Sequence, residues 1–312
     1  MEIASREEYV AALLAAPRPG SDKVLAFYDS RLDLVCADPA CMLVPLDDHI
    51  VHRGDGLFES ICYRERRLFA LTAHLDRMAE GAALLDIQPP CPFEAIAARI
   101  CEVARAGGED HGDIRVFLSR GPGGFGISPS ESPASSLYIV ALKSGLPDHE
   151  YYARGLTAFA SSIPPKQEYL ARIKNTNYLP NVFMAREAHA KNMDVAITFD
   201  DKGHIGEAAI ANVAIVDKDG VLRSPGLERI LPGTTLIAAL ELAASQMPVR
   251  KGPIHKDEIA TAQEMLLLTS ATLCVSITHF DGRPIGSGVP GPVSLWLREA
   301  LLSEMLKTGR KF

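Results

Sequence analysis

A lysine, a glutamate and a Gly-Thr-Thr turn follow one another along the second half of this chain. Lys174 lies in residues 172–180 and is followed by an Asn-Thr-Asn turn, Glu207 interrupts a small, apolar stretch, and residues 229–235 end in Gly-Thr-Thr. An amine forms an imine with an aldehyde, a carboxylate can hold a protonated ring nitrogen, and N–H groups at a helix start bind phosphate. The three together predict a site for an aldehyde cofactor that carries a phosphate.

Pyridoxal 5′-phosphate is the cofactor that these groups predict. We expect Lys174 to form the imine with it and to shuttle the α-proton of the substrate. Tyr178 follows closely enough to reach the phenolate oxygen of the cofactor. Glu207 is expected to keep the pyridine nitrogen protonated, so that the ring can accept carbanion electrons.

The phosphate has several candidate partners. Thr234 and Thr235 precede an expected helix, where backbone N–H groups and hydroxyls bind anions, although a plain helix cap would use the same residues. Ser270 lies in a hydroxyl cluster, residues 269–272, which follows an expected buried strand and can complete the phosphate site. Arg77 would supply the balancing charge, unless it is an exposed helical arginine paired with a neighbouring acid.

Composition and charge exclude several classes of protein. A length of 312 residues with 47% hydrophobic and 23% charged residues predicts a globular chain of two domains. The net charge of -7 argues against nucleic acid or an anionic membrane as partner. The acidic N-terminus lacks the apolar stretch of a secretory signal, and no apolar run is long enough to span a membrane, so we expect a cytoplasmic protein. The six cysteines form no Cys-x-x-Cys pair, and no metal site is expected.

Apolar periodicity predicts the elements that position these residues. We expect helices over residues 5–16, 71–85, 93–106, 182–190, 235–245 and 293–305, and strands over 23–29, 31–36, 114–119, 137–141, 195–199, 211–216 and 265–269. A hairpin is expected over 57–69, and residues 146–150 are the candidate crossing between domains. Ser5 with Glu8 is typical of a capping box, and Thr72 is expected to cap the second helix.

The order of six motifs resembles the class IV (fold-type IV) pyridoxal-phosphate family. These motifs are residues 53–59, 74–77, 120–126, 174–179, 207–212 and 230–235. The family holds branched-chain aminotransferases, D-amino-acid aminotransferases and 4-amino-4-deoxychorismate lyases, and the similarity runs from about residue 43 to residue 293.

The resemblance implies an α+β fold with two domains. A small N-terminal α/β domain would span residues 1–145, and a larger C-terminal α/β domain that binds the cofactor would span residues 146–312. It also implies a homodimer in which loops of the partner subunit complete each site. It supports the roles of Lys174, Tyr178 and Glu207, and it assigns phosphate-binding positions to Arg77, Thr234, Thr235 and Ser270.

Two arginines suggest how an amino acid would be bound. Many relatives carry an aromatic residue where Arg53 stands, and an arginine there is costly unless it meets an anion. With Arg115 it can clamp an α-carboxylate. This combination resembles an arginine-bearing subgroup of the family that includes D-amino-acid aminotransferases. Phe58 and Phe125 would shape an apolar pocket, and Ala271 is expected at the substrate as well. Arg120 is expected to hold the glycine loop of residues 120–126 rather than to touch the substrate.

Several functions therefore compete. A transaminase acting on a D-amino acid and a 2-oxo acid is favoured by Arg53 and Arg115, whereas Tyr178 and the Gly-Phe-Gly pattern favour branched-chain L-amino acids. Residues 54–59 and 119–124 resemble the lyases, although lyases usually carry arginine where Phe125 stands. A protein that binds a ligand without turnover is the remaining alternative, and the presence of Lys174 and Glu207 argues against it.

Overall fold

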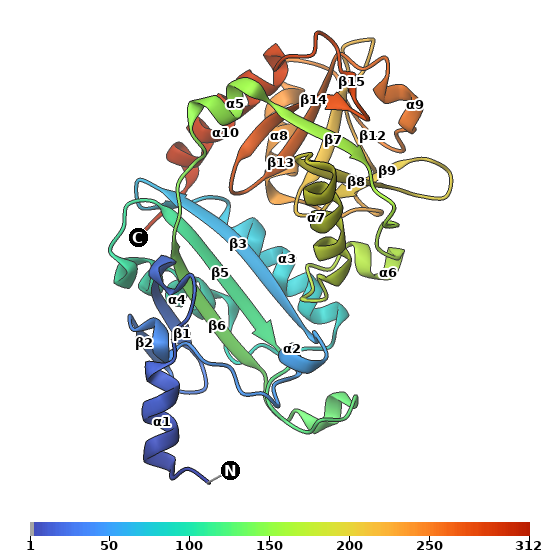
Figure 1. Ribbon diagram of the computed structural model, residues 1–312. Helices are drawn as coiled ribbons and strands as arrows, with labels where there is room; N and C mark the ends of the chain where they lie inside the picture. The colour runs from blue at the N-terminus through green and yellow to red at the C-terminus, as the bar shows by residue number, and fades with distance from the viewer. Residues whose placement is uncertain (1–2) are drawn as a thin grey trace. The chain divides into compact units, whose positions relative to one another are not determined.

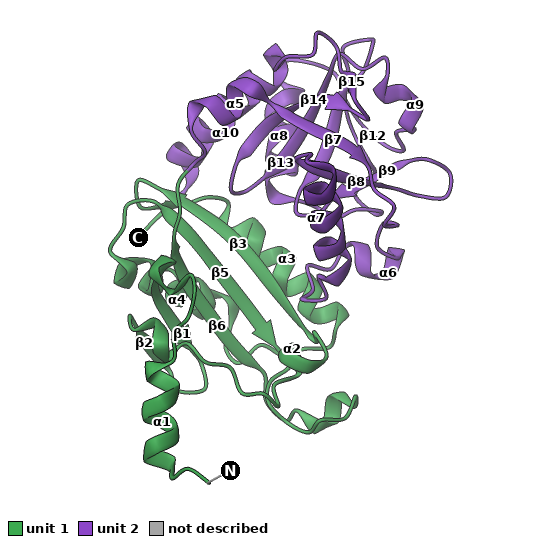
Figure 2. Ribbon diagram, in the orientation of Figure 1, with its two compact units in different colours: residues 1–145, 310–312 green, residues 146–309 purple. Residues whose placement is uncertain are grey.

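The chain folds into two compact units in a computed structural model that describes residues 3–312. The first unit ends at Gly145 and is joined by Arg310–Phe312, and the second is Leu146–Gly309 (Figure 2). The last three residues had been expected in the second domain. The N-terminal stretch was expected to contain no secretory signal, and its first two residues lie outside the described residues. Within residues 3–312, no helix combines the length and apolar character needed to cross a membrane.

An antiparallel sheet forms the centre of the first unit, with strand order β16-β4-β3-β5-β6-β1-β2. The elements of this unit are α1 (Arg6–Ala15), η1 (Ser21–Lys23), β1 (Val24–Asp29), β2 (Leu34–Cys36), η2 (Pro39–Cys41), α2 (His49–His52), β3 (Gly56–Arg64), β4 (Arg67–Leu68), α3 (Leu71–Leu84), α4 (Phe93–Gly107), β5 (Gly112–Ser119), η3 (Pro129–Glu131), β6 (Ser136–Lys143) and β16 (Arg310–Lys311).

Helices α3 and α4 cover one face of this sheet (Figure 1). Successive residues of a strand point to opposite faces, and those directly opposite on neighbouring strands share a face. Phe58 pairs with Phe117, and Ser60 pairs with Arg115. These four side chains therefore lie on one face, whereas Glu59 lies on the face that α3 covers.

The second unit is built on a mixed sheet with strand order β12-β11-β10-β13-β14-β7-β8-β9 and with β15 paired to β14. Its elements are α5 (His149–Arg154), β7 (Leu156–Ala160), α6 (Glu168–Ala171), α7 (Leu179–Lys191), β8 (Val195–Phe199), β9 (Ile205–Ala208), β10 (Asn212–Val216), β11 (Leu222–Ser224), α8 (Thr234–Ala244), β12 (Val249–Lys251), α9 (Lys256–Ile259), β13 (Glu264–Thr269), β14 (Leu273–Phe280), β15 (Arg283–Pro284) and α10 (Pro292–Thr308).

One apolar core lies against β7, β8, β10, β13 and β14 of this sheet, and α7 contacts β8. Strand β9 forms an edge of the sheet, whereas β10 pairs with β11 and β13. Only residues 209–211 separate these two strands, and the Ala208 N–H donates to the Ala211 carbonyl at 3.0 Å. This short turn brings Glu207 close to Asn212.

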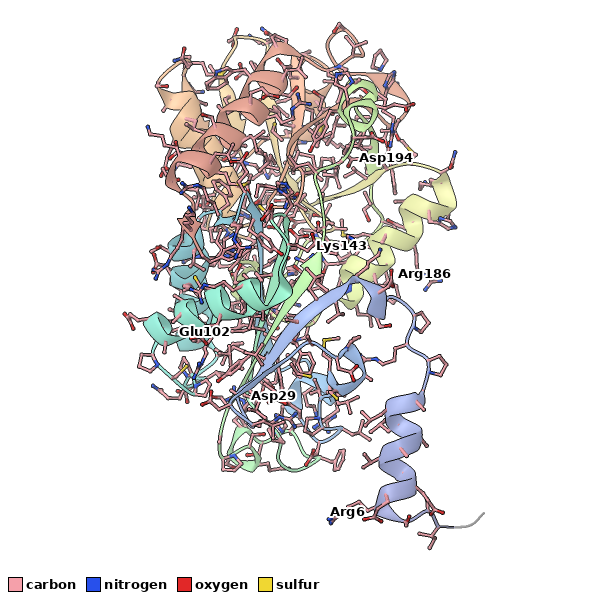
Figure 3. All side chains as sticks on the ribbon, turned by 90° about the vertical axis from the view of Figure 1, so that its left-hand side faces the viewer. Arg6, Asp29, Glu102, Lys143, Arg186 and Asp194 are labelled. Atoms are coloured by element: carbon pink, nitrogen blue, oxygen red, sulfur yellow. The ribbon has the colours of Figure 1, made fainter. Side chains whose placement is uncertain are left out.

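The predicted helices and most predicted strands are confirmed, including the capping box of Ser5 and Glu8 at α1. Two expectations were wrong. Thr72 does not cap α3, because the chain enters that helix through Ala70 in the left-handed conformation. The strand expected from residue 31 begins only at Leu34, because Asp29 at the end of β1 (Figure 3) accepts the backbone N–H of Arg31 at 2.9 Å and forms a turn. The sequence did not predict strands β7, β9, β12, β14, β15 and β16, nor the short helices α2, α5, α6 and α9.

Candidate active site

Lys174 faces Tyr178 across the loop between α6 and α7. The Lys174 Nζ donates to the Tyr178 hydroxyl at 3.3 Å. The buried Asn175 shapes this loop, because its Oδ1 accepts the backbone N–H of Asn177 at 3.1 Å. Pro180 then stands in the first turn of α7, where its missing N–H costs nothing. The polar turn seen in the sequence thus holds an amine and a phenol against each other.

The carboxylate of Glu207 is held by donors from another part of the second unit. Its Oε1 accepts the backbone N–H of Leu231, and the Asn212 Nδ2 lies 3.4 Å away. The backbone N–H and carbonyl of Glu207 both bond to the Thr198 hydroxyl at 3.0 Å. These hydrogen bonds fix the position of the Glu207 carboxylate.

Asn212 is a site residue that sequence reasoning missed. It is buried, and its Nδ2 also donates to the Leu231 carbonyl at 2.9 Å, so one side chain joins Glu207 to the turn before α8. Its Oδ1 approaches Gly233 so closely that an added Cβ there would lie 1.8 Å from it. Only a glycine fits at position 233, because the Asn212 side chain approaches its backbone closely. In the sequence, the Pro-Gly pair of residues 232–233 was the feature that could have indicated this close approach.

Thr234 and Thr235 are buried in the first turn of α8. Gly233 caps this helix without a side-chain hydrogen bond, which suits a helix start that binds an anion. The Thr235 hydroxyl lies 3.5 Å from that of Ser270, in the turn between β13 and β14. Ala271 is exposed at the tip of the same turn.

The donor set of the second unit fits pyridoxal 5′-phosphate. It offers an amine beside a phenol, a fixed carboxylate for a cationic nitrogen, and hydroxyls at a helix start for a phosphate. The carboxylate and the hydroxyls are linked directly, because Leu231, which binds Glu207, stands three residues before Thr234. The chemistry of these groups matches the three parts of this cofactor.

Lys166 is a second amine at Tyr178 that sequence reasoning missed. It follows Pro164 and Pro165 in the loop after β7, and its Nζ lies 4.8 Å from the centre of the Tyr178 ring. Burial lowers the pKa of Lys166, and the Glu207 carboxylate raises it in part. In the sequence, the only feature that could have indicated this role was the position of Lys166 between two prolines and the loop that carries Lys174.

In the first unit, Arg77 belongs to a buried group with Glu59 and His74. The Arg77 Nε and Nη2 donate to the two oxygens of Glu59 at 2.9 and 2.6 Å, and the His74 Nδ1 lies 2.6 Å from Oε2. Burial alone would raise the pKa of Glu59. The charges and hydrogen bonds of His74 and Arg77 outweigh it and lower the pKa of Glu59 from 4.5 to about 2.

This group should make the stability of the first unit depend on pH. Because the folded-state pKa of Glu59 is depressed, the stabilisation is fully present above pH 4.5 and is lost as pH falls from 4.5 to about 2. Glu59→Gln should lower the free energy of unfolding at neutral pH by about 3–5 kcal/mol, because it leaves the charge of Arg77 uncompensated. Urea unfolding over a pH series measures this. Glu102→Gln, at an exposed pair with Arg99, should cost less than about 1 kcal/mol, and equal losses would contradict the prediction.

Arg53 holds the glycine loop of residues 120–126 in the structure. Its Nε donates to the Gly126 carbonyl at 2.9 Å, and its Nη2 donates to that of Phe125, whose ring is exposed. Arg120, which was expected to hold this loop, instead binds Asp55 and donates to the Leu85 carbonyl at 2.7 Å. Arg53 thus has a loop-holding role beside the substrate role predicted for it.

Phe58 and Arg115 share the face of the first sheet that α3 does not cover. The rings of Phe58 and Phe117 are stacked with centroids 6.0 Å apart. Arg115 lies opposite Ser60, two residues along β3 from Phe58, and is half-buried. The sheet therefore presents an apolar surface beside a cation, a combination that suits an amino acid.

Comparison with known proteins identifies what this chain is similar to. The family model described as amino-transferase class IV matches residues 56–280. A chloroplastic D-amino-acid transaminase of Arabidopsis thaliana is 34% identical over 295 residues, which cover 92% of this chain and 78% of that protein. A branched-chain-amino-acid aminotransferase of Pseudomonas aeruginosa is 26% identical, with 81% of this chain and 84% of the relative covered.

Solved structures agree on the fold. A branched-chain amino acid aminotransferase of T.th. with pyridoxamine 5′-phosphate has a TM-score of 0.85 at 24% identity, covering 91% of this chain and 94% of its own. A putative 4-amino-4-deoxychorismate lyase of Legionella pneumophila has a TM-score of 0.76 at 23% identity, covering 84% and 95%. The α+β arrangement expected from the sequence, that of fold type IV, is confirmed.

Proposed function

We propose that this chain, which belongs to the class IV aminotransferase family, moves amino groups between an amino acid, preferably a D-amino acid, and a 2-oxo acid. It is an enzyme, and its cofactor is pyridoxal 5′-phosphate. The observation that carries the proposal is the Lys174 amine, 3.3 Å from the Tyr178 hydroxyl, in the same unit as a Glu207 carboxylate held by the Leu231 N–H.

Each group of the site has one task in this proposal. Lys174 forms the covalent link and moves the α-proton of the substrate at its Nζ. Tyr178 orients that amine, and Glu207 holds a proton at the ring nitrogen. Thr234, Thr235 and Ser270 hold the phosphate. Arg77 was predicted as a further partner of the phosphate, and in the first unit its Nε and Nη2 donate to Glu59. When bound, the cofactor supplies a carbonyl that accepts the amino group and a cationic ring that withdraws electrons from the α-carbon.

The preference for D-amino acids rests on the arginines and on a relative. Arg53 and Arg115 are two cations for an α-carboxylate, and a relative with 34% identity is named a D-amino-acid transaminase. Phe58, Phe125 and Ala271 would border the side chain of the substrate. We also propose a homodimer in which partner loops complete each site, and a location in the cytoplasm.

Two alternatives have support of their own. The Pseudomonas aeruginosa relative, named a branched-chain-amino-acid aminotransferase, favours L-amino acids with apolar side chains. The motif of residues 54–59 resembles that of the lyases, which would release pyruvate from aminodeoxychorismate. Both alternatives use the same lysine and cofactor. The branched-chain alternative differs from the proposal in the substrate, whereas the lyase differs in the reaction as well.

A substrate panel decides among them. D- and L-amino acids are offered with 2-oxoglutarate or pyruvate, and pyruvate release from aminodeoxychorismate is assayed in parallel. We expect kcat/KM for the best D-amino acid to exceed that for its L-enantiomer by at least about tenfold, a difference of about 1.4 kcal/mol in transition-state binding. A reversed ratio would favour the branched-chain alternative, and pyruvate release without transamination would favour the lyase.

A further inference from the structure

Lys166 is an amine beside the cofactor site to which the proposed reaction gives no task. It is half-buried in the loop between β7 and α6. Lys166 and Glu207 line the same small cavity of about 20 Å³, which has room for about one water molecule. Its Nζ lies 4.8 Å from the centre of the Tyr178 ring.

Tyr178 therefore contacts two amines, one at its hydroxyl and one over its ring. The Lys174 Nζ contacts its hydroxyl at 3.3 Å and is 5.8 Å from the ring centre, whereas Lys166 lies over the ring. A cation over an aromatic ring is attracted to its π electrons, and it stabilises negative charge that develops on the phenol oxygen. The charge of Lys166 thus acts on the phenol whose oxygen accepts the hydrogen bond of Lys174.

Burying the charge of Lys166 costs desolvation free energy, which a residue that only filled space would avoid. Burial lowers the pKa of Lys166, and only the Glu207 carboxylate counteracts this. An apolar side chain of the same length would fill the space beside the ring without that desolvation cost. The ammonium of Lys166 therefore attracts both the ring of Tyr178 and the carboxylate of Glu207.

The other charges at this place are already paired with each other. Arg229 lines the same cavity, and its Nη2 lies 3.3 Å from Glu168 and 3.6 Å from Asp200. Arg229 thus shares its charge with two carboxylates, and Lys166 is the cation beside Lys174 that acts on Tyr178 and Glu207.

We propose that Lys166 is a positioning residue whose ammonium holds the Tyr178 phenol in place for Lys174 and offsets part of the negative charge of Glu207. The inference rests on the proposed function, because it concerns the proton at the nitrogen of Lys174 when the cofactor is bound. Lys166 itself forms no bond with the substrate or the cofactor.

The test is a pH titration of the visible absorption of the cofactor-loaded protein. The two amines lie 4.8 and 5.8 Å from the centre of the same Tyr178 ring, so removing the Lys166 cation makes protonation of the Lys174 nitrogen easier. Lys166→Met should therefore raise the titration midpoint by about half a pH unit. Lys166→Gln, a second neutral variant, should give the same shift if Lys166→Met fails to fold. Lys166→Arg keeps the charge and should restore the wild-type midpoint.

Lys191 offers a matched control. Its Nζ lies 5.0 Å from the centre of the Phe159 ring, a similar arrangement at the other end of α7. The length of that helix places it about 20 Å from Tyr178. Lys191→Met should leave the midpoint unchanged.

Each outcome decides something different. An unmoved midpoint in both neutral variants, or an equal shift in Lys191→Met, overturns the role of Lys166 and leaves the transaminase proposal intact. If the wild-type protein mixed with pyridoxal 5′-phosphate develops no visible band, the proposed function itself fails, and the role of Lys166 fails with it.

Discussion

Lys174→Ala is expected to abolish turnover while the protein still binds pyridoxal 5′-phosphate noncovalently. The substitution removes the covalent link and the amine that moves the α-proton, whereas Glu207 and the hydroxyls at the start of α8 remain. Loss of a general acid–base group alone lowers kcat by about 10²–10⁴-fold. Because both tasks are lost, we expect a decrease at or beyond the upper end of that range.

Borohydride trapping tests the same assignment directly. Reduction of the wild-type protein with its cofactor, followed by peptide mapping, should label Lys174 and no other lysine. Lys191→Ala, at an exposed lysine of the same unit, should keep wild-type kcat and the label. A label on Lys166, or near wild-type turnover by Lys174→Ala, would show that another amine performs the chemistry.

Glu207→Gln should lower kcat by about a hundredfold without unfolding the protein. A glutamine keeps an oxygen that can accept the backbone N–H of Leu231, so the fold around β9 is preserved. It carries no charge, however, and cannot hold a proton at the ring nitrogen of the cofactor. The ring then withdraws electrons from the α-carbon less well, and loss of the α-proton becomes slower.

Steady-state kinetics and the melting temperature separate these effects. Glu187→Gln is the matched control, because Glu187 is another carboxylate of the second unit that accepts hydrogen bonds, here from Ser161 and Ser162. We expect that control to change stability and to leave kcat unaltered. If Glu207→Gln kept wild-type kcat, Glu207 would have only a structural role.

Local sequence patterns determined the parts of this protein that depend on neighbours along the chain. The capping box at Ser5, the hairpin of β3 and β4 and the long amphipathic helices were foreseen, because backbone capping and apolar periodicity act within a few residues. The pairing of Lys174 with Tyr178 is of the same kind, since only the three residues of one polar turn lie between them. Glu207 was recognisable because a charge stood in an apolar stretch.

Tertiary structure alone decided which distant groups meet. The N–H of Leu231 binds Glu207, Glu59 binds Arg77, and β16 pairs with β4 across most of the length of the chain. Lys166 lies over Tyr178 for the same reason. These contacts depend on strand order, on register and on the course of the loops. The alternation of apolar and polar residues predicts only which face of an element is buried, and it does not predict which partner covers that face.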